Sequence, residues 1–504
     1  MTRVVPPRME RVSTGDVAMD RLLCGGIPVR SVNVIAGEPG AGKTLFALQM
    51  LFHQARLGKK ALYLTTLSEP SLKLFNYMQQ FSFFEERFIG REIVFADLGS
   101  VLRSKGLEAT LTEITGRVER EEPAIVVIDS FKAIRDVLGD SSAVRTFVYD
   151  LAVHTSTWGA VSLFVGEYTE AEVATHSEFV IADGILRFVN RRDNLTAVRE
   201  VEILKLRGAD YVTGRHFFEI GSDGLRFFPR VQGPVHVARA HSSPSSSSAP
   251  ESIASEPTAP TERVVTGIHG LDQMLVGGLP NSSATVVQGG TGSGKTLLGL
   301  QFLLEGARLG QPGILFTLEE TADQLRGIAL GFGWDLASLE ERGLLTLSYV
   351  SPVELSTDWF LDHALRQVTE CGARRAVLDS LTSMAVGVLS ERRFKELVYA
   401  FTKHFRALGV TLVMNMEIAE LLGATKLSGY GVSFAADNVI QLRYIELEGR
   451  LERGISVLKV RGVRHSTEVR RMNLGATGVD VGAPFRGLHG VLTGLPVRSG
   501  SEGP

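Results

Sequence analysis

Short apolar runs rich in β-branched residues alternate with longer helical segments through most of the chain. The runs are SVNVIAG, ALYLTTL, AIVVIDS and AVSLFVGE in the first half, and SATVVQGG, GILFTLEE, RAVLDS and VTLVMNME in the second. Continuous apolar strands that alternate with helices are typical of a parallel sheet covered on both faces. The pattern therefore predicts an α/β fold, whose ligands bind at the carboxyl ends of the strands.

The two halves repeat the same phrases in the same order. GEPGAGKT at residue 37 returns as GGTGSGKT at residue 289, and LKLRG at residue 204 returns as LKVRG at residue 458. The spacing between matching residues is nearly constant: 252 residues from Lys43 to Lys295, 250 from Asp129 to Asp379, and 254 from Lys205 to Lys459. Such a register indicates duplication of a whole domain. We expect a first domain over residues 1–237 and a second over residues 263–484.

The segment between the halves has a different composition. Residues 238–262, ARAHSSPSSSSAPESIASEPTAPTE, are rich in Ser, Pro and Ala and contain almost no large apolar side chain. Such a segment cannot bury enough apolar surface to offset the entropy of ordering, so we predict a disordered linker. Residues 485–504 are predicted to form a flexible C-terminal tail with a short apolar patch, LHGVLTGLP.

The strongest chemical signal is a phosphate loop in each half. Both copies fit the pattern G-x-x-x-x-G-K-[ST], follow an apolar strand and precede an apolar helix. Glycines let backbone N–H groups surround phosphates, and the helix N-terminus adds a positive dipole end. A glycine-rich turn that binds nothing is the alternative, and two copies in this context argue against it. The predicted nucleotide-binding residues are Gly37, Gly40, Ala41, Gly42, Lys43 and Thr44, and Gly289, Gly292, Ser293, Gly294, Lys295 and Thr296.

Metal ligation is predicted from the same loops and from a later strand. Thr44 and Thr296 follow the loop lysines and are the expected Mg²⁺ ligands. Asp129 and Asp379 end the runs IVVID and AVLD, where a nucleoside triphosphatase places the aspartate that holds magnesium through water. An aspartate that caps a helix is the alternative.

Carboxylates at another strand end are candidate catalytic groups. Glu319 and Glu320 lie in TLEET just after the run GILF. Adjacent residues of an extended segment point in opposite directions. One can therefore aim at the γ-phosphate as a general base, while the other orients it. In the first half the phrase is TLSEP, with Ser68 and Glu69, so only one carboxylate remains. A solvated acidic loop is the alternative.

A pair of cations follows near the end of each domain. Lys205 and Arg207 in the first half match Lys459 and Arg461 in the second, within K-x-R-G. Alternate residues share one face of a strand, so both cations should project together. Such a pair is suited to completing a neighbour's nucleotide site in trans. A surface pair without a specific role is the alternative.

Charge and cysteine content exclude several classes of protein. The formal net charge is −3, and no basic stripe stands out, so we do not expect a nucleic-acid partner. Two cysteines exclude a disulfide framework and an all-cysteine zinc site, which favours a reducing cytoplasm. The N-terminus lacks the apolar core of a signal peptide, and no apolar stretch is long enough to span a bilayer.

Tandem domains with a phosphate loop, a TLEET-type strand end and a terminal K-x-R-G resemble the KaiC family of circadian-clock ATPases. The resemblance covers both halves and excludes the linker and the extreme ends. It implies two RecA-like P-loop domains, each a mostly parallel sheet flanked by helices, that bind ATP and Mg²⁺ between subunits of a double-ring homohexamer. The first ring would be a slow ATPase, and the second an autokinase and autophosphatase. The resemblance also implies that the tail docks a protein regulator.

The family's phosphoacceptors, an adjacent Ser–Thr pair, precede DNVIQLRY. Here the sequence is GYGVSFAADN, in which Ser433 is present and Phe434 replaces the threonine. Phenylalanine has no hydroxyl, so a two-site cycle cannot run, and a one-site switch at Ser433 remains, with Ser428 a weaker candidate. A purely structural serine is the alternative. Glu178 and Phe179 lie near this position in the first half, which should therefore not be phosphorylated.

Two further functions remain open at this point. A RecA-type DNA motor or recombinase needs basic or aromatic loops that bind single strands, but EYTEAEVATHSE and MEIAELLGATKLSGYG are acidic or neutral. An ATP-assembled scaffold with little turnover is slightly favoured by the missing first-half glutamate. The first hypothesis is a KaiC-like ATPase with serine autokinase activity in its second domain, acting as a signalling or timing switch.

Overall fold

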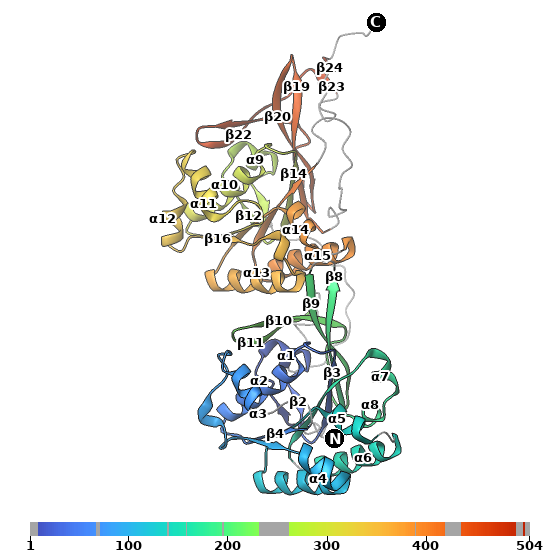
Figure 1. The fold of residues 1–504 in the computed structure, drawn as a ribbon. Coiled ribbons are helices and arrows are strands. Elements are labelled where there is room, and N and C mark those ends of the chain that lie inside the picture. Colours follow the sequence, from blue (N-terminus) through green and yellow to red (C-terminus); the bar gives the residue numbers. More distant parts are fainter. Residues whose placement is uncertain are drawn as a thin grey trace, which may run out of the picture. The chain divides into compact units, whose positions relative to one another are not determined.

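The computed structural model describes residues 9–66, 71–138, 141–157, 159–193, 196–230, 262–388, 390–418, 435–489 and 497–498. The chain divides into two compact units, Met1–Arg230 and Val231–Pro504. Each unit is an α/β sandwich with one large central sheet (Figure 1). Residues 238–261 of the predicted linker lie outside the described part of the chain.

The described part of the first unit contains eleven strands, eight α-helices and the 3₁₀ helix η1 (Glu86–Phe88). The strands are β1 (Arg11–Val12), β2 (Ile27–Pro28), β3 (Val32–Gly37), β4 (Ala61–Thr65), β5 (Ile93–Asp97), β6 (Ile125–Asp129), β7 (Val161–Glu167), β8 (Gly184–Asp193), β9 (Thr196–Leu206), β10 (Arg215–Gly221) and β11 (Gly224–Phe228). The helices are α1 (Val17–Leu22), α2 (Lys43–Arg56), α3 (Ser71–Met78), α4 (Gly99–Glu121), α5 (Phe131–Leu138), α6 (Ser141–Thr157), α7 (Glu170–Thr175) and α8 (Ser177–Ile181).

The second unit repeats this series. Its strands are β12 (Arg263–Val264), β13 (Leu279–Pro280), β14 (Ala284–Gly289), β15 (Gly313–Thr317), β16 (Leu345–Tyr349), β17 (Arg375–Asp379), β18 (Thr411–Glu417), β19 (Asn438–Leu447), β20 (Arg450–Val460), β21 (Arg470–Gly475), β22 (Gly478–Pro484), β23 (Leu488–His489) and β24 (Val497–Arg498). Its helices are α9 (His269–Met274), α10 (Lys295–Arg308), α11 (Ala322–Leu330), α12 (Leu336–Glu341), α13 (Thr357–Cys371), α14 (Leu381–Gly387) and α15 (Glu391–Ala407).

The two large sheets have the same strand order. The nine-stranded sheet of the first unit runs β5-β4-β6-β7-β3-β8-β9-β10-β11, and that of the second runs β16-β15-β17-β18-β14-β19-β20-β21-β22. Neighbours from β5 to β8 are parallel, and those from β8 to β11 are antiparallel. The second sheet has the same division at β19. The duplication read from the sequence is therefore a duplication of topology.

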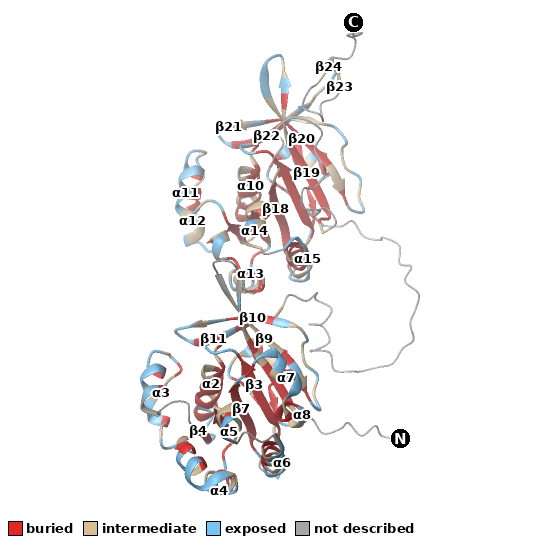
Figure 2. Cartoon of the chain, turned by 45° about the vertical axis from the view of Figure 1, so that its right-hand side comes forward, coloured by how far each residue is buried: buried red, intermediate tan, exposed pale blue. Residues whose placement is uncertain are grey.

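Helices cover both faces of each sheet, because successive residues of a parallel strand point to opposite sides. Ile35 of β3 packs into a cluster with Phe46 of α2, whereas its neighbour Val34 packs with Phe131 of α5. In the second unit, the clusters on the two faces of β14 likewise contain α10 on one side and α15 on the other. Figure 2 shows these strands buried between exposed helix surfaces.

The structure confirms the fold class and adds strands that the sequence pattern did not identify. These are β5 and β16 at one edge and β8, β10, β11, β19, β21 and β22 at the other. The K-x-R-G lysines lie on β9 and β20 as expected of a strand, whereas Arg207 and Arg461 lie one residue beyond the strand ends. Strands β10 and β21 mix apolar and charged residues, as in RHFFEIG and RRMNLG, so they do not form continuous apolar runs. Within residues 485–504, Leu488–His489 pairs with Val497–Arg498 in an antiparallel ladder.

Candidate nucleotide-binding sites

Both phosphate loops lie between the central parallel strand and the helix that follows it, β3 and α2 or β14 and α10. Gly42 and Gly294 stand immediately before these helices with φ of 93° and 103°, in the left-handed region. A side chain there would be strained. A Cβ on Gly294 would also lie 3.0 Å from the Met472 side chain. Glycine is therefore required for the loop to turn sharply into the helix.

The loop lysines are buried and donate to carbonyl oxygens of their own loops. Lys43 Nζ donates to Glu38 O at 2.7 Å, and Lys295 Nζ donates to Gly289 O at 3.0 Å and Gly290 O at 2.9 Å. Burial lowers the pKa of both lysines, and nearby carboxylates oppose the shift. A buried ammonium enclosed by a glycine-rich loop suits a polyphosphate, which would supply the missing negative charge.

The predicted magnesium ligands meet in both units. Thr44 Oγ1 donates to Asp129 Oδ2 at 2.7 Å, and Thr296 Oγ1 donates to Asp379 Oδ2 at the same distance. Burial raises the pKa of Asp379, and the Thr296 hydrogen bond opposes this. In the part of the chain that is described, no group of three or more His, Cys, Asp or Glu side chains has the arrangement of a metal site. The threonine–aspartate pair fits Mg²⁺, which usually keeps water and phosphate oxygens as its other ligands.

The two glutamates of the second unit have different surroundings. Glu319 Oε1 accepts hydrogen bonds from Ser380 Oγ at 2.6 Å and Ser383 Oγ at 2.5 Å. Glu320 Oε2 is buried and has no hydrogen-bond partner. Burial raises the pKa of Glu320, and the charge of Asp379 adds to the increase. A carboxylate with a raised pKa is a better proton acceptor than an ordinary one, which suits a general base. Glu69 and Ser68 lie outside the described residues.

The K-x-R-G cations contact main-chain carbonyls of the segments that precede the neighbouring strands β8 and β19. Lys205 Nζ donates to Val180 O at 3.0 Å, and Arg207 donates to carbonyls at the end of α8. In the second unit Lys459 Nζ donates to Ala436 O at 2.8 Å. The cations of each pair therefore lie together. The Arg461 side chain is 71% exposed, so its guanidinium is open to a second molecule.

The predicted phosphoacceptor Ser433, its neighbour Phe434 and the weaker candidate Ser428 lie outside the described residues. In the first unit the matching segment forms α8. Glu178 is fully buried there and pairs with Arg135 of α5 at 2.5 Å. Its carboxylate also raises the pKa of the buried Tyr168 hydroxyl, in addition to the larger effect of burial.

Sequence reasoning missed three residues that the structure brings to the second site. Ser380 and Ser383 bind Glu319, and Glu417 at the end of β18 accepts a hydrogen bond from Thr291 of the phosphate loop. Glu417 could have been identified from the sequence. It ends an apolar run, and strand ends of a parallel sheet meet at one edge. The serines follow Asp379 by one and four residues, and only the fold shows that they face β15.

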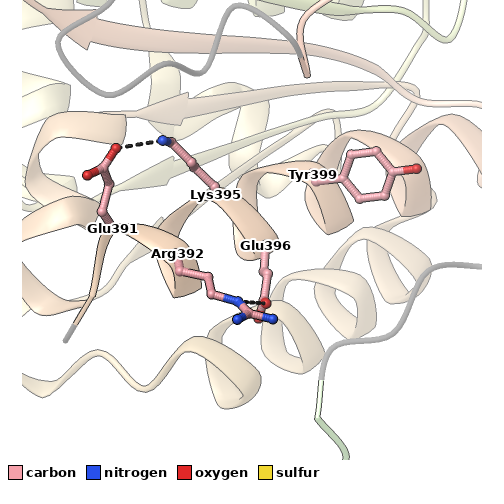
Figure 3. Close-up of a pocket in the computed structure, with 5 residues that line it drawn as sticks. All are labelled: Glu391, Arg392, Lys395, Glu396 and Tyr399. Carbon is pink, nitrogen blue, oxygen red and sulfur yellow. Dashed lines mark hydrogen bonds and ion pairs between the residues drawn. The ribbon is translucent and has the colours of Figure 1, made fainter.

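A hollow on the surface of α15 is lined by Glu391, Arg392, Lys395, Glu396 and Tyr399 (Figure 3). Its charges are paired along the helix, with Lys395 Nζ 2.6 Å from Glu391 and Arg392 Nε 3.1 Å from Glu396. Exposed pairs of this kind contribute little and indicate a solvated helix face. None of these residues belongs to the predicted nucleotide sites.

The fold and the loop geometry define a P-loop ATPase with two RecA-like domains. A family model described as "ATPase: KaiC" matches residues 12–232 and 264–485. The chain therefore belongs to the KaiC ATPase family. No helix among the described residues has the length and apolar character needed to cross a membrane.

Curated relatives match almost the whole chain. The circadian clock oscillator protein KaiC of Rippkaea orientalis is 27% identical over 97% of this chain and 92% of its own. The circadian clock protein KaiC3 of Synechocystis is 28% identical over 97% of this chain and 95% of its own. KaiC of Picosynechococcus is 26% identical over 97% and 93%. The similarity therefore extends over both units.

Proposed function

We propose that the chain hydrolyses ATP in a hexameric double ring and phosphorylates itself on Ser433 of the second domain, acting as a signalling or timing switch in the cytoplasm. The observation that carries this proposal is the set of groups gathered at the second site. A phosphate-loop lysine, a threonine–aspartate pair and two glutamates, of which one is hydrogen-bonded and the other is not, lie at one edge of the sheet. The family and its clock-protein relatives support the same function.

The proposed chemistry assigns each group a task. Lys295 and the loop N–H groups bind the phosphates, while Thr296 and Asp379 would hold Mg²⁺, which supplies charge neutralisation when bound. The Ser433 hydroxyl of a neighbouring subunit attacks the γ-phosphorus, and the bond to the β–γ bridging oxygen breaks, releasing ADP. A glutamate carboxylate accepts the hydroxyl proton. Water in place of the serine gives hydrolysis, for which the first domain has Glu69.

Assembly into rings is supported by the exposed cations. Arg207 and Arg461 have side chains that are 57% and 71% exposed, so each can reach an adjacent subunit's nucleotide. We propose Lys205, Arg207, Lys459 and Arg461 as the trans contacts. Residues 485–504 are the proposed docking segment for a protein regulator. Multi-angle light scattering with and without ATP measures the ring, and we expect six subunits only with nucleotide.

The decisive experiment is intact-mass measurement after incubation with ATP and magnesium, followed by peptide mapping. We expect one added phosphate on Ser433, absent in Lys295→Ala and retained in the matched first-domain variant Lys43→Ala. ATP turnover without any added phosphate would refute the autokinase and leave an ATPase. Phosphate on another residue would refute the assignment to Ser433.

An ATP-assembled scaffold is the second candidate. It is favoured by Ser68, which stands where the second half has a glutamate, so the first domain has fewer groups able to activate water. Trace turnover by an intact hexamer would support it. A DNA motor has less support, because the segment that begins at the last residue of β7 is acidic and contains Glu167, Glu170, Glu172 and Glu178. Salt-dependent retention on DNA would revive that function.

A further inference from the structure

Glu417 faces the second phosphate loop from the neighbouring strand. It ends β18, which is parallel to β14, and it stands opposite Gly289 in the register. Its carboxylate accepts a hydrogen bond from Thr291 Oγ1 at 2.5 Å, and Thr291 is the third residue of the loop. Glu417 is a firmly held group, since its own N–H donates to Thr382 Oγ1 at 2.8 Å and the next N–H donates to Gly289 O at 3.1 Å.

This carboxylate lies at the same part of the sheet edge as the cation proposed to receive phosphate. Lys295 Nζ donates to Gly289 O at 3.0 Å, and Gly289 stands opposite Glu417 in the register. A negative group at this position competes with a phosphate for the same ammonium. The competition should be stronger for ATP than for ADP, because the additional phosphate of ATP carries the additional negative charge.

The first domain provides a natural comparison. Glu167 ends β7 and stands opposite Gly37 in the same register. At the position of Thr291, however, the first loop has Pro39, which has no hydroxyl to donate. The first domain therefore retains the carboxylate and lacks the group that holds it. The hydrogen bond between loop and strand end is a property of the second domain.

We propose that Glu417 determines how the second site discriminates between ATP and ADP. Its carboxylate competes with the triphosphate for Lys295, and the Thr291 hydroxyl restrains it at the tip of the loop. The proposal rests on nucleotide binding at the second loop, which is part of the proposed function. It adds a specificity-determining residue that acts on binding and is independent of whether Ser433 is phosphorylated.

Two substitutions separate the charge from the hydrogen bond. Glu417→Gln removes the charge and keeps an oxygen that accepts from Thr291. Thr291→Val removes the donor and frees the charged carboxylate to approach Lys295. We expect Glu417→Gln to tighten binding of a non-hydrolysable ATP analogue about fivefold and of ADP by less than about twofold. Thr291→Val should weaken analogue binding, and it should have no effect when Glu417→Gln is also present.

The measurement is displacement of a fluorescent nucleotide by the ATP analogue or by ADP. The full chain carries Lys43→Ala, so that the signal comes from the second phosphate loop alone. Glu167→Gln in the same background is the matched control and should leave the second-site affinities unchanged. An unchanged ratio of analogue to ADP affinity in Glu417→Gln would overturn the proposal, as would a Thr291→Val effect that persists without the Glu417 charge. Absence of any binding that depends on Lys295 would instead refute the proposed function.

Discussion

The two nucleotide sites share their backbone and differ in the side chains around it. Thr44 and Asp129 hydrogen-bond at 2.7 Å, as do Thr296 and Asp379. The second site adds Glu319, which accepts from two serine hydroxyls. At the matching positions the first half has Ser68, Ser130 and Ala133. Duplication therefore preserved the parts proposed to bind nucleotide and metal, while the groups around the proposed base diverged.

The second difference favours the first unit, whose helix α5 provides charged partners for the segment before β8 that α14 does not provide for the segment before β19. In the first unit α5 holds this segment through Arg135, which pairs with Glu178, and Lys132, which pairs with Glu172 at 2.8 Å. At the matching positions of α14 the second unit has Ala385 and Thr382. The first segment is fixed by charges that its counterpart cannot reproduce from α14. This agrees with our proposal that only the second segment carries a phosphoacceptor.

The largest expected change is in ATP turnover by the second domain when both proposed catalytic carboxylates are removed. In a Lys43→Ala background, Glu319→Gln with Glu320→Gln should lower second-domain ATP turnover by about 10² to 10⁴-fold, since general-base catalysis contributes that much. ATP binding, measured with a fluorescent nucleotide, should persist because the phosphate loop is intact, and loss of two negative charges near Lys295 should not weaken it. Turnover within a few-fold of the parent would show that neither carboxylate is the base.

Breaking the buried pair of the first unit should reduce its stability. Arg135→Ala leaves the fully buried Glu178 without its arginine partner, with His176 3.6 Å from the other carboxylate oxygen, and should cost about 3–5 kcal/mol, as for other buried pairs. Chemical denaturation, followed by hydrogen exchange of each unit, measures the loss. Arg135→Met with Glu178→Leu is the control that removes both charges and should recover much of the stability. Equal destabilisation by both variants would show that volume matters more than charge.

Removing one serine donor should have a moderate effect. Ser383→Ala takes away one of the two hydroxyls that orient Glu319, so we expect second-domain turnover to fall about five- to tenfold. The matched change in the first unit, Ala133→Ser, should leave first-domain turnover unchanged, because residue 68, which corresponds to Glu319, is a serine. Single-turnover kinetics in the respective Lys→Ala backgrounds measure both. A gain of activity in Ala133→Ser would mean that Glu69 uses the same support.

The smallest expected effect is on the pH dependence of second-domain turnover. A general base acts when deprotonated, and the raised pKa of Glu320 means that protonation begins at a higher pH than for an ordinary glutamate. Second-domain turnover should therefore be full above this pKa and decline as the pH falls through it. The acid limb of the rate profile should disappear in Glu320→Gln. An acid limb that persists in Glu320→Gln would show that another group titrates.

Much of this arrangement follows from the sequence because strand ends of a parallel sheet converge. The rule placed Asp129 and Asp379 beside the threonines that follow the loop lysines, and the structure brings them within 2.7 Å. The same rule would have identified Glu417. Ser383 was beyond it, because its contact with Glu319 joins two elements separated by 64 residues. Strands β10 and β21 were missed because their mixed polarity resembles that of surface loops.

In the proposed ring, the contacts of the Lys205 and Lys459 ammonium groups would reduce the entropy lost on assembly. Each donates to a carbonyl of its own chain before any neighbour is present, Val180 O in one unit and Ala436 O in the other. A long flexible side chain ordinarily loses about 2 kcal/mol of rotamer freedom when an interface immobilises it. Here part of that loss occurs on folding. Subunits would therefore meet with their projecting cations preorganised, which lowers the concentration at which rings form.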